Sequence, residues 1–341
     1  MSTGTEATAS ARGLAFLAER QLPSGGFSLR YGFDVADGPT EPDDHTVFGT
    51  ALIAHSLGFC RDGAVRPVLA RAVEHLRAHM EPGGVWRHWT PSAPQYHVVA
   101  PDVDDTAYVS GVLRDNGVAV PDNRAVLLAN RDRRGLFYTW FIARWPPPRS
   151  ARLWAIAARR ARHPLEGRKL WTTTPAFPSD VDGIVNANVL AYLGEGPHAA
   201  PVVARLTEVF RAGEEGRCDS WYRGPFTFYY AVTRTRLRGF DPIADELCAR
   251  IRAAAAPDGR IGDGPLDTAL AACALCNLGA EPELRERACD WLARVQAPDG
   301  SWPAAAFYYA GPREDPPLPR WGSPELTTGF CLEALARCRA T

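Results

Sequence analysis

The chain has 341 residues, of which 46% are hydrophobic, so it can form one large domain with a sizeable core. Its formal net charge of −1 argues against nucleic-acid binding, which requires a basic face. The N-terminus has no signal-peptide pattern, and no apolar run reaches the roughly 18 residues that span a bilayer. We therefore expect a cytoplasmic protein.

One pattern recurs along the chain: an amphipathic helix, a turn that contains glycine, and then an aromatic or aliphatic residue. It is clearest over residues 288–302, where a helix ends at Gln296 and is followed by Gly300 and Trp302. Further copies, some of them weaker, occupy residues 13–27, 72–86, 127–137 and 249–261. Such internal repetition predicts a fold built from repeated helical units.

A second type of helix follows each turn, and its first residues are usually acidic or able to cap a helix. The predicted starts lie at residues 43–46, 102–106, 180–182, 226–230, 266–268 and 323–325. Side-chain oxygens there accept hydrogen bonds from the free N–H groups of a first turn. The second helices carry few charges, as in residues 269–279, which predicts burial on all sides. We therefore expect an all-α fold, an (α/α)6 double-ring toroid with six inner and about six outer helices in a single domain, residues 1–341.

Residues 133–178 break the repeat spacing and are rich in aromatic residues and proline, including Phe137, Trp140 and the prolines at 146–148. We expect an irregular insertion within the ring. Long insertions in repeat folds tend to lie on the functional face, although an outer layer packed by aromatic rings accounts for the composition equally well.

The acidic run Asp102-Val103-Asp104-Asp105 falls in the first turn of the second inner helix. Three carboxylates this close cannot all ionise freely, so at least one keeps its proton at neutral pH. The helix N-terminus and Thr106 stabilise the ionised partners. Capping needs only one such side chain, so the run predicts a strong carboxylic acid able to protonate an alkene or an epoxide.

The string Asp-Val-Asp-Asp-Thr-Ala at 102–107 resembles the acid motif of class II terpene cyclases, a group that includes squalene–hopene and copalyl-type diterpene cyclases. The unit at Gln296, Gly300 and Trp302 resembles the Gln–Trp repeat of that family. The resemblance implies that Asp104, the middle acid, is the proton donor, with Asp102 and Asp105 as supporting carboxylates.

The resemblance also implies a small-molecule isoprenoid substrate, with peripheral membrane contact as one route for its delivery. The family's active site lies between two α/α domains, of which this chain matches one. The ring would then enclose its own pocket, or the insertion, a partner subunit or a second copy of the chain would close it.

Aromatic residues near the predicted helix starts could fold an isoprenoid chain and shelter a carbocation. Each ring face stabilises a cation by about 0.5–2 kcal/mol without acting as a strong base. The alternative is that these rings only pack the hub of the toroid. The candidate substrate-binding residues are Trp86, Trp89, Phe137, Trp140, Trp221, Phe228, Tyr229, Tyr230 and Tyr308.

A second polar run contains Asp180, Asp182 and Asn186, and a further acidic pair consists of Asp43 and Asp44. The same two interpretations apply to both groups. One interpretation is a site for Mg²⁺ or a diphosphate near the mouth of the ring. The other is helix capping followed by hydrogen bonds between helices. Mg²⁺ is thus expected only for a substrate that carries a diphosphate, and His88 and His97 are candidates to hydrogen-bond to the acid run.

The leading hypothesis is a terpene cyclase or isomerase that uses Asp104 as a Brønsted acid. One alternative is a carbohydrate-active hydrolase or lyase, with Asp44 or Asp182 opposite Asp104 as the paired carboxylates. Another is a non-catalytic isoprenoid-binding relative. The β subunits of protein prenyltransferases resemble the repeat as well, but they need an Asp-x-Cys zinc motif that this sequence lacks.

Overall fold

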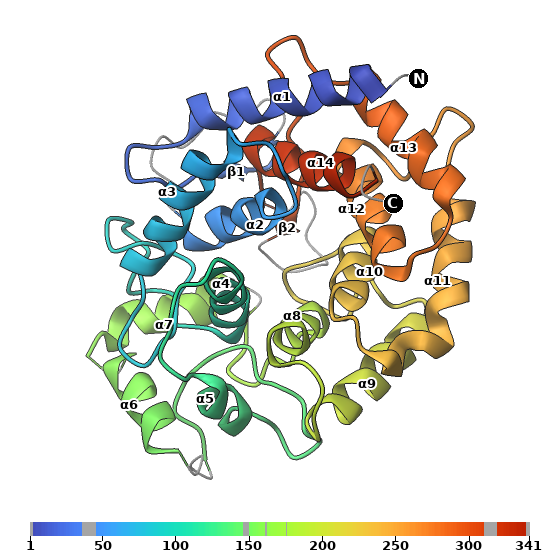
Figure 1. Cartoon of the computed structure of the whole chain (residues 1–341). Helices are drawn as coiled ribbons and strands as arrows, with labels where there is room; N and C mark the ends of the chain where they lie inside the picture. The colour runs from blue at the N-terminus through green and yellow to red at the C-terminus, as the bar shows by residue number, and fades with distance from the viewer. Residues whose placement is uncertain are drawn as a thin grey trace.

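Two concentric rings of helices surround a common axis in the computed structural model (Figure 1). The structure describes residues 3–35, 46–145, 150–160, 162–174, 176–309 and 319–338. Within these residues the inner ring consists of α2 (Val47–Leu57), α4 (Val103–Asp115), α8 (Gly183–Leu193), α10 (Pro225–Arg234), α12 (Pro265–Leu278) and α14 (Pro324–Cys338). The outer ring consists of α1 (Thr3–Arg20), α3 (Val65–Ala78), α5 (Arg124–Ala129), α9 (Ala199–Ala212), α11 (Asp241–Ala253) and α13 (Pro282–Arg294). The predicted all-α double-ring toroid is confirmed.

Contacts between neighbouring inner helices close the ring. Each inner helix packs against the next inner helix along the chain, and α14 packs against α2. Helix α1 contacts both α13 and α14, which joins the two ends of the chain. Residues at or just before the starts of α2, α4, α8, α10 and α14 line one cavity, and residues near the C-terminal ends of α2, α4, α8, α10 and α12 line another. The inner helices therefore begin at one end of the toroid and finish at the other.

The two rings differ in sequence because they differ in surroundings. In α2 every residue except His55 is buried, whereas the outer helix α9 buries one stripe that includes Val202, Leu206 and Val209. A helix surrounded by other helices must be apolar all round, and one facing solvent needs only a stripe. None of the helices within the described ranges has both the length and the apolar character needed to cross a membrane.

The repeated glutamine and glycine have a structural purpose. The side-chain amide of Gln296 donates hydrogen bonds to the carbonyl of Gly300 at 2.8 Å and to that of Ala9, on the neighbouring outer helix, at 2.9 Å. In the next repeat around the ring, Gln21 makes the equivalent bonds to the carbonyls of Gly25 and Val68. Gly300 has a φ of +90°, and a Cβ there would lie 2.5 Å from the carbonyl oxygen of Arg12. Each turn is thereby fastened to the next outer helix.

A polar side chain on most inner helices fastens the turn from the other side. A side-chain oxygen accepts the backbone N–H of the residue that follows the glycine turn, at 2.8–3.2 Å. The pairs are Thr50 with Phe27, Thr106 with Trp86, Asn186 with Phe137, Thr268 with Ile261, and Thr328 with Trp302. These bonds satisfy buried backbone groups and fix the distance between the rings.

A small antiparallel sheet crosses one end of the ring. It consists of β1 (Arg30–Gly32), β2 (Tyr308–Tyr309) and β3 (Arg320–Gly322) in the order β1-β3-β2. Tyr31 pairs with Trp321, and Trp321 pairs with Tyr308. The sequence pattern indicated almost no strands, because strands of two or three residues are too short to show an alternation.

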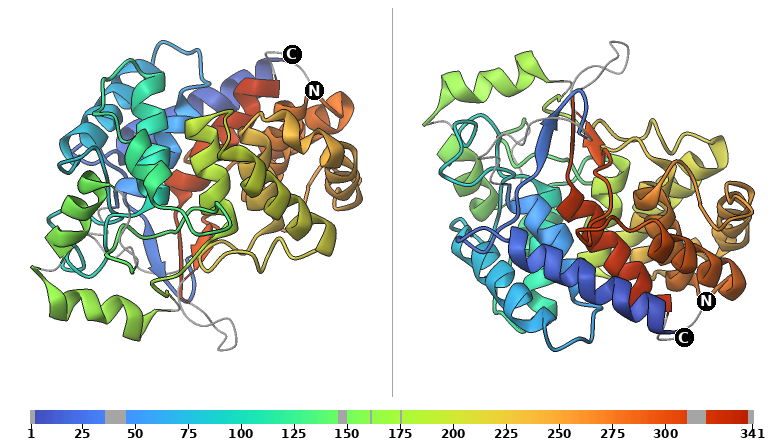
Figure 2. Two further views of the ribbon diagram at one scale, coloured as in Figure 1. Left: turned by 90° about the horizontal axis from the view of Figure 1, so that it is seen from below. Right: turned by 90° about the horizontal axis from the view of Figure 1, so that it is seen from above.

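Two further helices lie in the interval 133–178. They are α6 (Ala151–Arg160), which buries Leu153 and Ile156, and α7 (Pro164–Thr173), which buries Leu170. Helix α7 projects from the ring on the side where the sheet lies (Figure 2), and α6 packs beside α5 at the outside of the ring. The described part of this interval is therefore partly helical, and it stands beside the end of the toroid where the inner helices begin.

We predict that Gly300→Ala lowers the free energy of unfolding more than Gly213→Ala does. Both glycines have a positive φ, but nothing lies within 4 Å of a Cβ at Gly213. The control should lose about 1 kcal/mol from the left-handed backbone. The Gly300 variant should lose roughly 1–3 kcal/mol more from the clash with Arg12. Urea denaturation measures both, and equal losses would contradict this account of the turn.

Candidate active site

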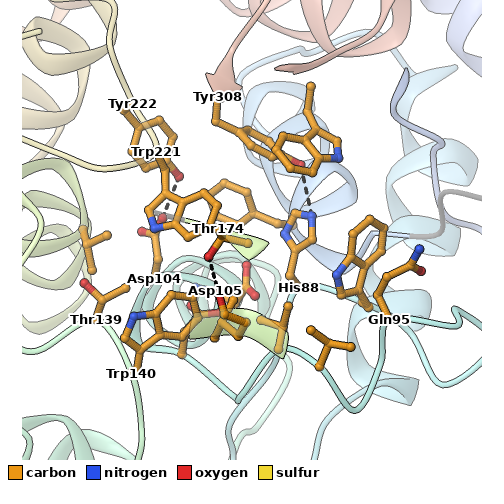
Figure 3. A pocket seen from close by; sticks show the side chains of 18 of the residues that line it. His88, Gln95, Asp104, Asp105, Thr139, Trp140, Thr174, Trp221, Tyr222 and Tyr308 are labelled. Atoms are coloured by element: carbon orange, nitrogen blue, oxygen red, sulfur yellow. Dashed lines mark hydrogen bonds between the residues drawn. The ribbon is translucent and has the colours of Figure 1, made fainter. Parts of the chain in front are cut away.

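A cavity of about 340 Å³ opens at the end of the toroid where the inner helices begin (Figure 3). This volume lies within the range of small-molecule sites. All three carboxyls of the acidic run line it, together with Leu170, Thr173 and Thr174 of the α7 region. Its aromatic wall consists of Tyr31, Phe48, His88, Trp89, Trp140, Trp221, Tyr222, Tyr308 and Trp321. The chain thus presents buried acids to a largely aromatic chamber.

The acidic run begins helix α4, as its sequence predicted. Asp102 is the N-cap residue, and its Oδ1 accepts a hydrogen bond from the backbone N–H of Asp105 at 2.7 Å. The backbone of Asp102 also bridges to Trp86 and to Trp140. Asp104 and Asp105 follow in the first helical turn, and all three side chains are buried. Asp102 therefore holds the turn that presents its two neighbours to the cavity.

Asp104 receives a hydrogen bond on each of its carboxyl oxygens. The side-chain amide of Asn188, on α8, donates to Oδ1 at 2.7 Å, and the hydroxyl of Tyr222 donates to Oδ2 at 2.6 Å. Figure 3 shows Tyr222 reaching Asp104 from the opposite wall of the cavity. Both donors stabilise the ionised carboxylate more than the neutral acid. Asp104 is thus held in one orientation and made a stronger acid than burial alone would allow.

Asp219 positions the segment that carries Tyr222. Its Oδ1 accepts the backbone N–H groups of Trp221 at 2.8 Å and Tyr222 at 3.1 Å. Its Oδ2 accepts the backbone N–H of Ile184 at 3.0 Å, in the first turn of α8. One buried carboxyl therefore connects the loop before α10 to the start of α8. These two segments carry Tyr222 and Asn188, the two donors to Asp104.

Burial dominates the protonation of the acidic run. It raises the pKa of Asp104 to about 6 against the hydrogen bonds from Tyr222 and Asn188, which lower it. Burial also raises the pKa of Asp102 to about 7 and that of Asp105 well above its ordinary range, with the adjacent Asp102 adding to the rise for Asp105. The run keeps at least one proton at neutral pH.

Asp105 and Asp104 differ in how well the protein supports their ionised forms. Oδ2 of Asp105 has no hydrogen-bond partner within the part of the chain that the structure describes. An unsolvated carboxylate without donors is costly, so Asp105 favours its neutral form. Asp104, with two donors, gives up a proton most readily of the two.

Four of the nine candidate aromatic residues line the cavity: Trp89, Trp140, Trp221 and Tyr308. Trp140 packs edge-on against both Trp171 and Trp221, with ring centroids 5.8 and 6.0 Å apart. Tyr308 stacks on Trp321 at 5.1 Å. These contacts fix the rings in place, so that the cavity has a defined aromatic surface.

The other five candidates are packed inside the protein outside the lining, which corrects the expectation that they would line the cavity. The ring N–H of Trp86 donates to the carbonyl of Leu76 at 2.8 Å. The hydroxyls of Tyr229 and Tyr230 donate to Glu215 and Glu333. Phe137 and Phe228 are fully buried outside the lining. A residue that follows a repeat turn points back toward the outer ring. This direction explains why Trp86 and Phe137 do not reach the cavity.

The second polar run makes hydrogen bonds within the protein. Asp182 accepts from the Thr139 hydroxyl at 2.6 Å and from the Ser220 N–H at 2.8 Å, and Asp180 accepts from the Phe177 N–H at 2.8 Å. Asn186 bonds to both the N–H and the carbonyl of Phe137. Asp43 and Asp44 lie outside the described residues. Within the described ranges, no three His, Cys, Asp or Glu side chains are grouped so that they could hold a metal ion.

The candidate histidines lie apart from the acid. His88 lines the cavity, but its Nε2 bonds to the Tyr308 hydroxyl at 3.2 Å, and burial lowers its pKa to about 3. His97 stacks on His163 with ring centroids 3.7 Å apart. His88 is therefore a neutral wall residue at physiological pH.

Asn188, Asp219 and Tyr222 were not among the site residues predicted from the sequence. Asn188 lies two positions from Asn186, so the two side chains leave α8 on nearly opposite sides. Only the inward one reaches Asp104. The available signal was an amide on an otherwise apolar inner helix, which requires a buried partner.

Solved structures share this fold over almost the whole chain. A protein from Actinoplanes has a TM-score of 0.71 at 20% sequence identity, with 98% of this chain and 100% of that chain covered. The type II terpene cyclase MstE from Scytonema, in its apo form, has a TM-score of 0.73 at 16% identity, with 99% of both chains covered. An MstE variant in complex with its substrate geranylgeranyl dihydroxybenzoate has a TM-score of 0.71 at 16% identity, over 99% of this chain and 98% of that one.

No protein-family model matches the sequence, and no curated protein does. At 16% and 20% identity the likeness is one of fold. The comparisons therefore show that this chain shares, from end to end, the α/α toroid of the type II terpene cyclase MstE.

Proposed function

We propose that this protein is a class II-type terpene cyclase or isomerase, in which Asp104 protonates an alkene or an epoxide of an isoprenoid substrate. One observation carries the proposal. Asp104 is a buried acid with a hydrogen-bond donor on each oxygen, and it faces a chamber walled by aromatic rings. An acid that must transfer a proton to carbon needs access to a proton and a stabilised conjugate base. Burial raises the pKa of Asp104 to about 6, and its two donors stabilise the carboxylate.

The chemistry is redox-neutral. The Asp104 proton adds to one carbon of a C=C bond, or to an epoxide oxygen, and leaves a tertiary cation and an Asp104 carboxylate. A second C=C bond of the same molecule attacks the cation, which forms a ring bond and moves the charge along the chain. Loss of a proton, or addition of water, ends the reaction. Tyr222 and Asn188 hold the carboxylate while the cation exists.

The aromatic wall suits such a cation. Trp89, Trp140, Trp221 and Tyr308 present ring faces or edges to the cavity without providing a strong base. Each well-placed ring face contributes about 0.5–2 kcal/mol to a nearby cation. The rings also exclude water, which would otherwise quench the cation early.

The comparison supports an isoprenoid as the substrate class. MstE, which shares the fold, has been solved with geranylgeranyl dihydroxybenzoate as substrate and with merosterolic acid A as product. The substrate-bound MstE chain is matched over 98% of its length by this single ring. We therefore propose that the single ring holds the substrate by itself.

The carbohydrate alternative receives less support. Its paired carboxylates would have to face each other across a sugar. The acids that line the cavity, among the described residues, are Asp102, Asp104 and Asp105, which share one helical turn. Asp182 is engaged by Thr139 and Ser220 outside the lining, and Asp44 lies outside the described residues.

Asp104→Asn should abolish turnover, because an amide has no transferable proton. With geranylgeranyl dihydroxybenzoate and geranylgeranyl diphosphate as probe substrates, we expect a loss of at least about 1,000-fold, measured by mass spectrometry of the products.

Asp105→Asn should lose roughly 10- to 100-fold in turnover, because it removes a supporting carboxyl. In D₂O the native enzyme should place one deuterium from the initiating step in each product.

Asp115→Asn is the matched control, since Asp115 ends the same helix and pairs with Arg114 far from the cavity. It should keep full activity. Turnover by a folded Asp104→Asn variant would contradict the proposal. Tight binding of the probes without turnover by the native protein would instead favour a binding relative, and cleavage of oligosaccharides would favour the carbohydrate alternative.

The rate should fall as the pH rises. The protonated acid is the active form, and burial raises the pKa of Asp104 to about 6 and that of Asp102 to about 7. Above this range, kcat/KM should drop about tenfold for each pH unit, with an apparent pKa that belongs to the coupled carboxyls. A profile measured from pH 5 to pH 9 tests this. A rate that increased across the same range would indicate a carboxylate acting as base.

A further inference from the structure

A charged side chain lies behind the acid, on the side away from the cavity. Asn188 donates to Oδ1 of Asp104 at 2.7 Å, and the carbonyl oxygen of the same amide accepts a hydrogen bond from Nη2 of Arg234 at 2.6 Å. Asn188 is buried, so this is a continuous chain from a guanidinium to the acid. Helices α4, α8 and α10, which carry the three residues, are consecutive in the inner ring (Figure 1).

Arg234 is held firmly in this position. It is the last residue of α10, and its guanidinium carbon lies 4.1 Å from the centroid of the Tyr108 ring, in a cation–π contact. A cation at a helix C-terminus is favourable in itself, which gives Arg234 a purely structural reason to be there. The hydrogen bond to Asn188 is an additional feature that this reason does not require.

The charge of Arg234 is not neutralised by a neighbouring acid. Among the described residues it forms no ion pair, since Glu333, the nearby carboxylate on α14, is paired with Arg337. The other groups near Arg234 are Tyr108, Tyr230 and His55. The positive charges of Arg236 and Arg337 also act on His55, where they help to lower its pKa. The groups that act on Asp104 from other elements include Tyr222, Asn188 and the buried acids Asp182 and Asp219, in addition to Arg234. Within the described part of the chain, Arg234 is thus the cation found to act on Asp104.

We propose that Arg234 is a positioning residue that, through Asn188, stabilises the carboxylate left on Asp104 after proton transfer and so sets the strength of the acid. This inference rests on the proposed function. A cation bonded to the amide oxygen polarises the amide and strengthens its N–H as a donor to the carboxylate. Arg234 does this without touching the substrate, because it lies outside the lining of the reaction cavity.

The same arginine lines a second cavity, of about 330 Å³, near the C-terminal ends of the inner helices. Arg114 lines it too, where it bonds to the carbonyl of Tyr192 and lies over the Tyr192 ring, with no bond to Asn188. Arg114→Met is therefore a matched control for Arg234→Met. Both variants remove a guanidinium that packs on a tyrosine, and only one of them breaks the chain to Asp104.

Arg234→Met should weaken the acid. Burial raises the pKa of Asp104, and Arg234 is among the groups that oppose that rise, so its removal should raise the pKa further. We expect the alkaline limb of the rate profile to move up by about one pH unit and kcat at low pH to fall about tenfold. Arg234→Lys should recover part of both, and Arg114→Met should leave both unchanged.

The pKa of Asp104 can also be followed without turnover, by the carboxyl ¹³C resonance of aspartate-labelled protein, assigned by its absence in Asp104→Asn. We expect an upward shift of about one unit in Arg234→Met. In an Asn188→Ala background, the same Arg234 substitution should add little, because the link is already broken. An equal shift in that background would overturn the role of Asn188 as the link.

The outcomes separate the inference from the proposed function. A folded Arg234→Met variant with native kcat, rate profile and ¹³C titration would overturn the inference, and lower stability alone would assign Arg234 a structural role. If Asp104→Asn still turned over substrate, the proposed function would fail. The ¹³C titration would then still report whether Arg234 acts on Asp104.

Discussion

The burial of three carboxyls in one helical turn is the constraint on which the rest of the site depends. Removing ionisable groups from water is expensive unless hydrogen bonds or a helix terminus replace the lost solvation. No ion pair of the described residues involves Asp102, Asp104 or Asp105, so hydrogen bonds must supply the stabilisation. The closed ring makes this feasible. Its inner helices all begin at one end, so that α8 and the loop before α10 deliver donors to the first turn of α4.

One inner helix departs from the regular way in which the ring holds its turns. On five inner helices a Thr or Asn holds the preceding turn, but the corresponding position on α10 is Phe228, which accepts no such bond. The segment before α10 is held by Asp219 instead, and it sends Trp221 and Tyr222 into the cavity. Among the described residues, the segment before α10 thus lacks the usual fastening, and it supplies Tyr222, one of the two partners of Asp104.

The sequence was sufficient to predict the ring and the place of the acidic run, because a helical repeat and a capped first turn are local patterns. It was insufficient for the partners of the acid. Asn186 and Asn188 look equivalent in the sequence, yet one fastens a turn and the other bonds to Asp104. Which aromatic residues face the cavity also depends on contacts between distant segments. Trp86 turns outward and Trp89 inward, and Trp321 arrives on a strand too short to predict.

The cavity is assembled from two kinds of structure. The carboxyls and their donors belong to the ring, where each position is fixed by several buried hydrogen bonds. Leu170, Thr173 and Thr174 come from α7 and the residue that follows it, and Tyr31 and Trp321 come from the small sheet, all of them outside the two rings. The shape of the chamber and the strength of its acid are thus set by separate parts of the chain. The α7 side can therefore differ in outline while the ring keeps the hydrogen bonds to Asp104.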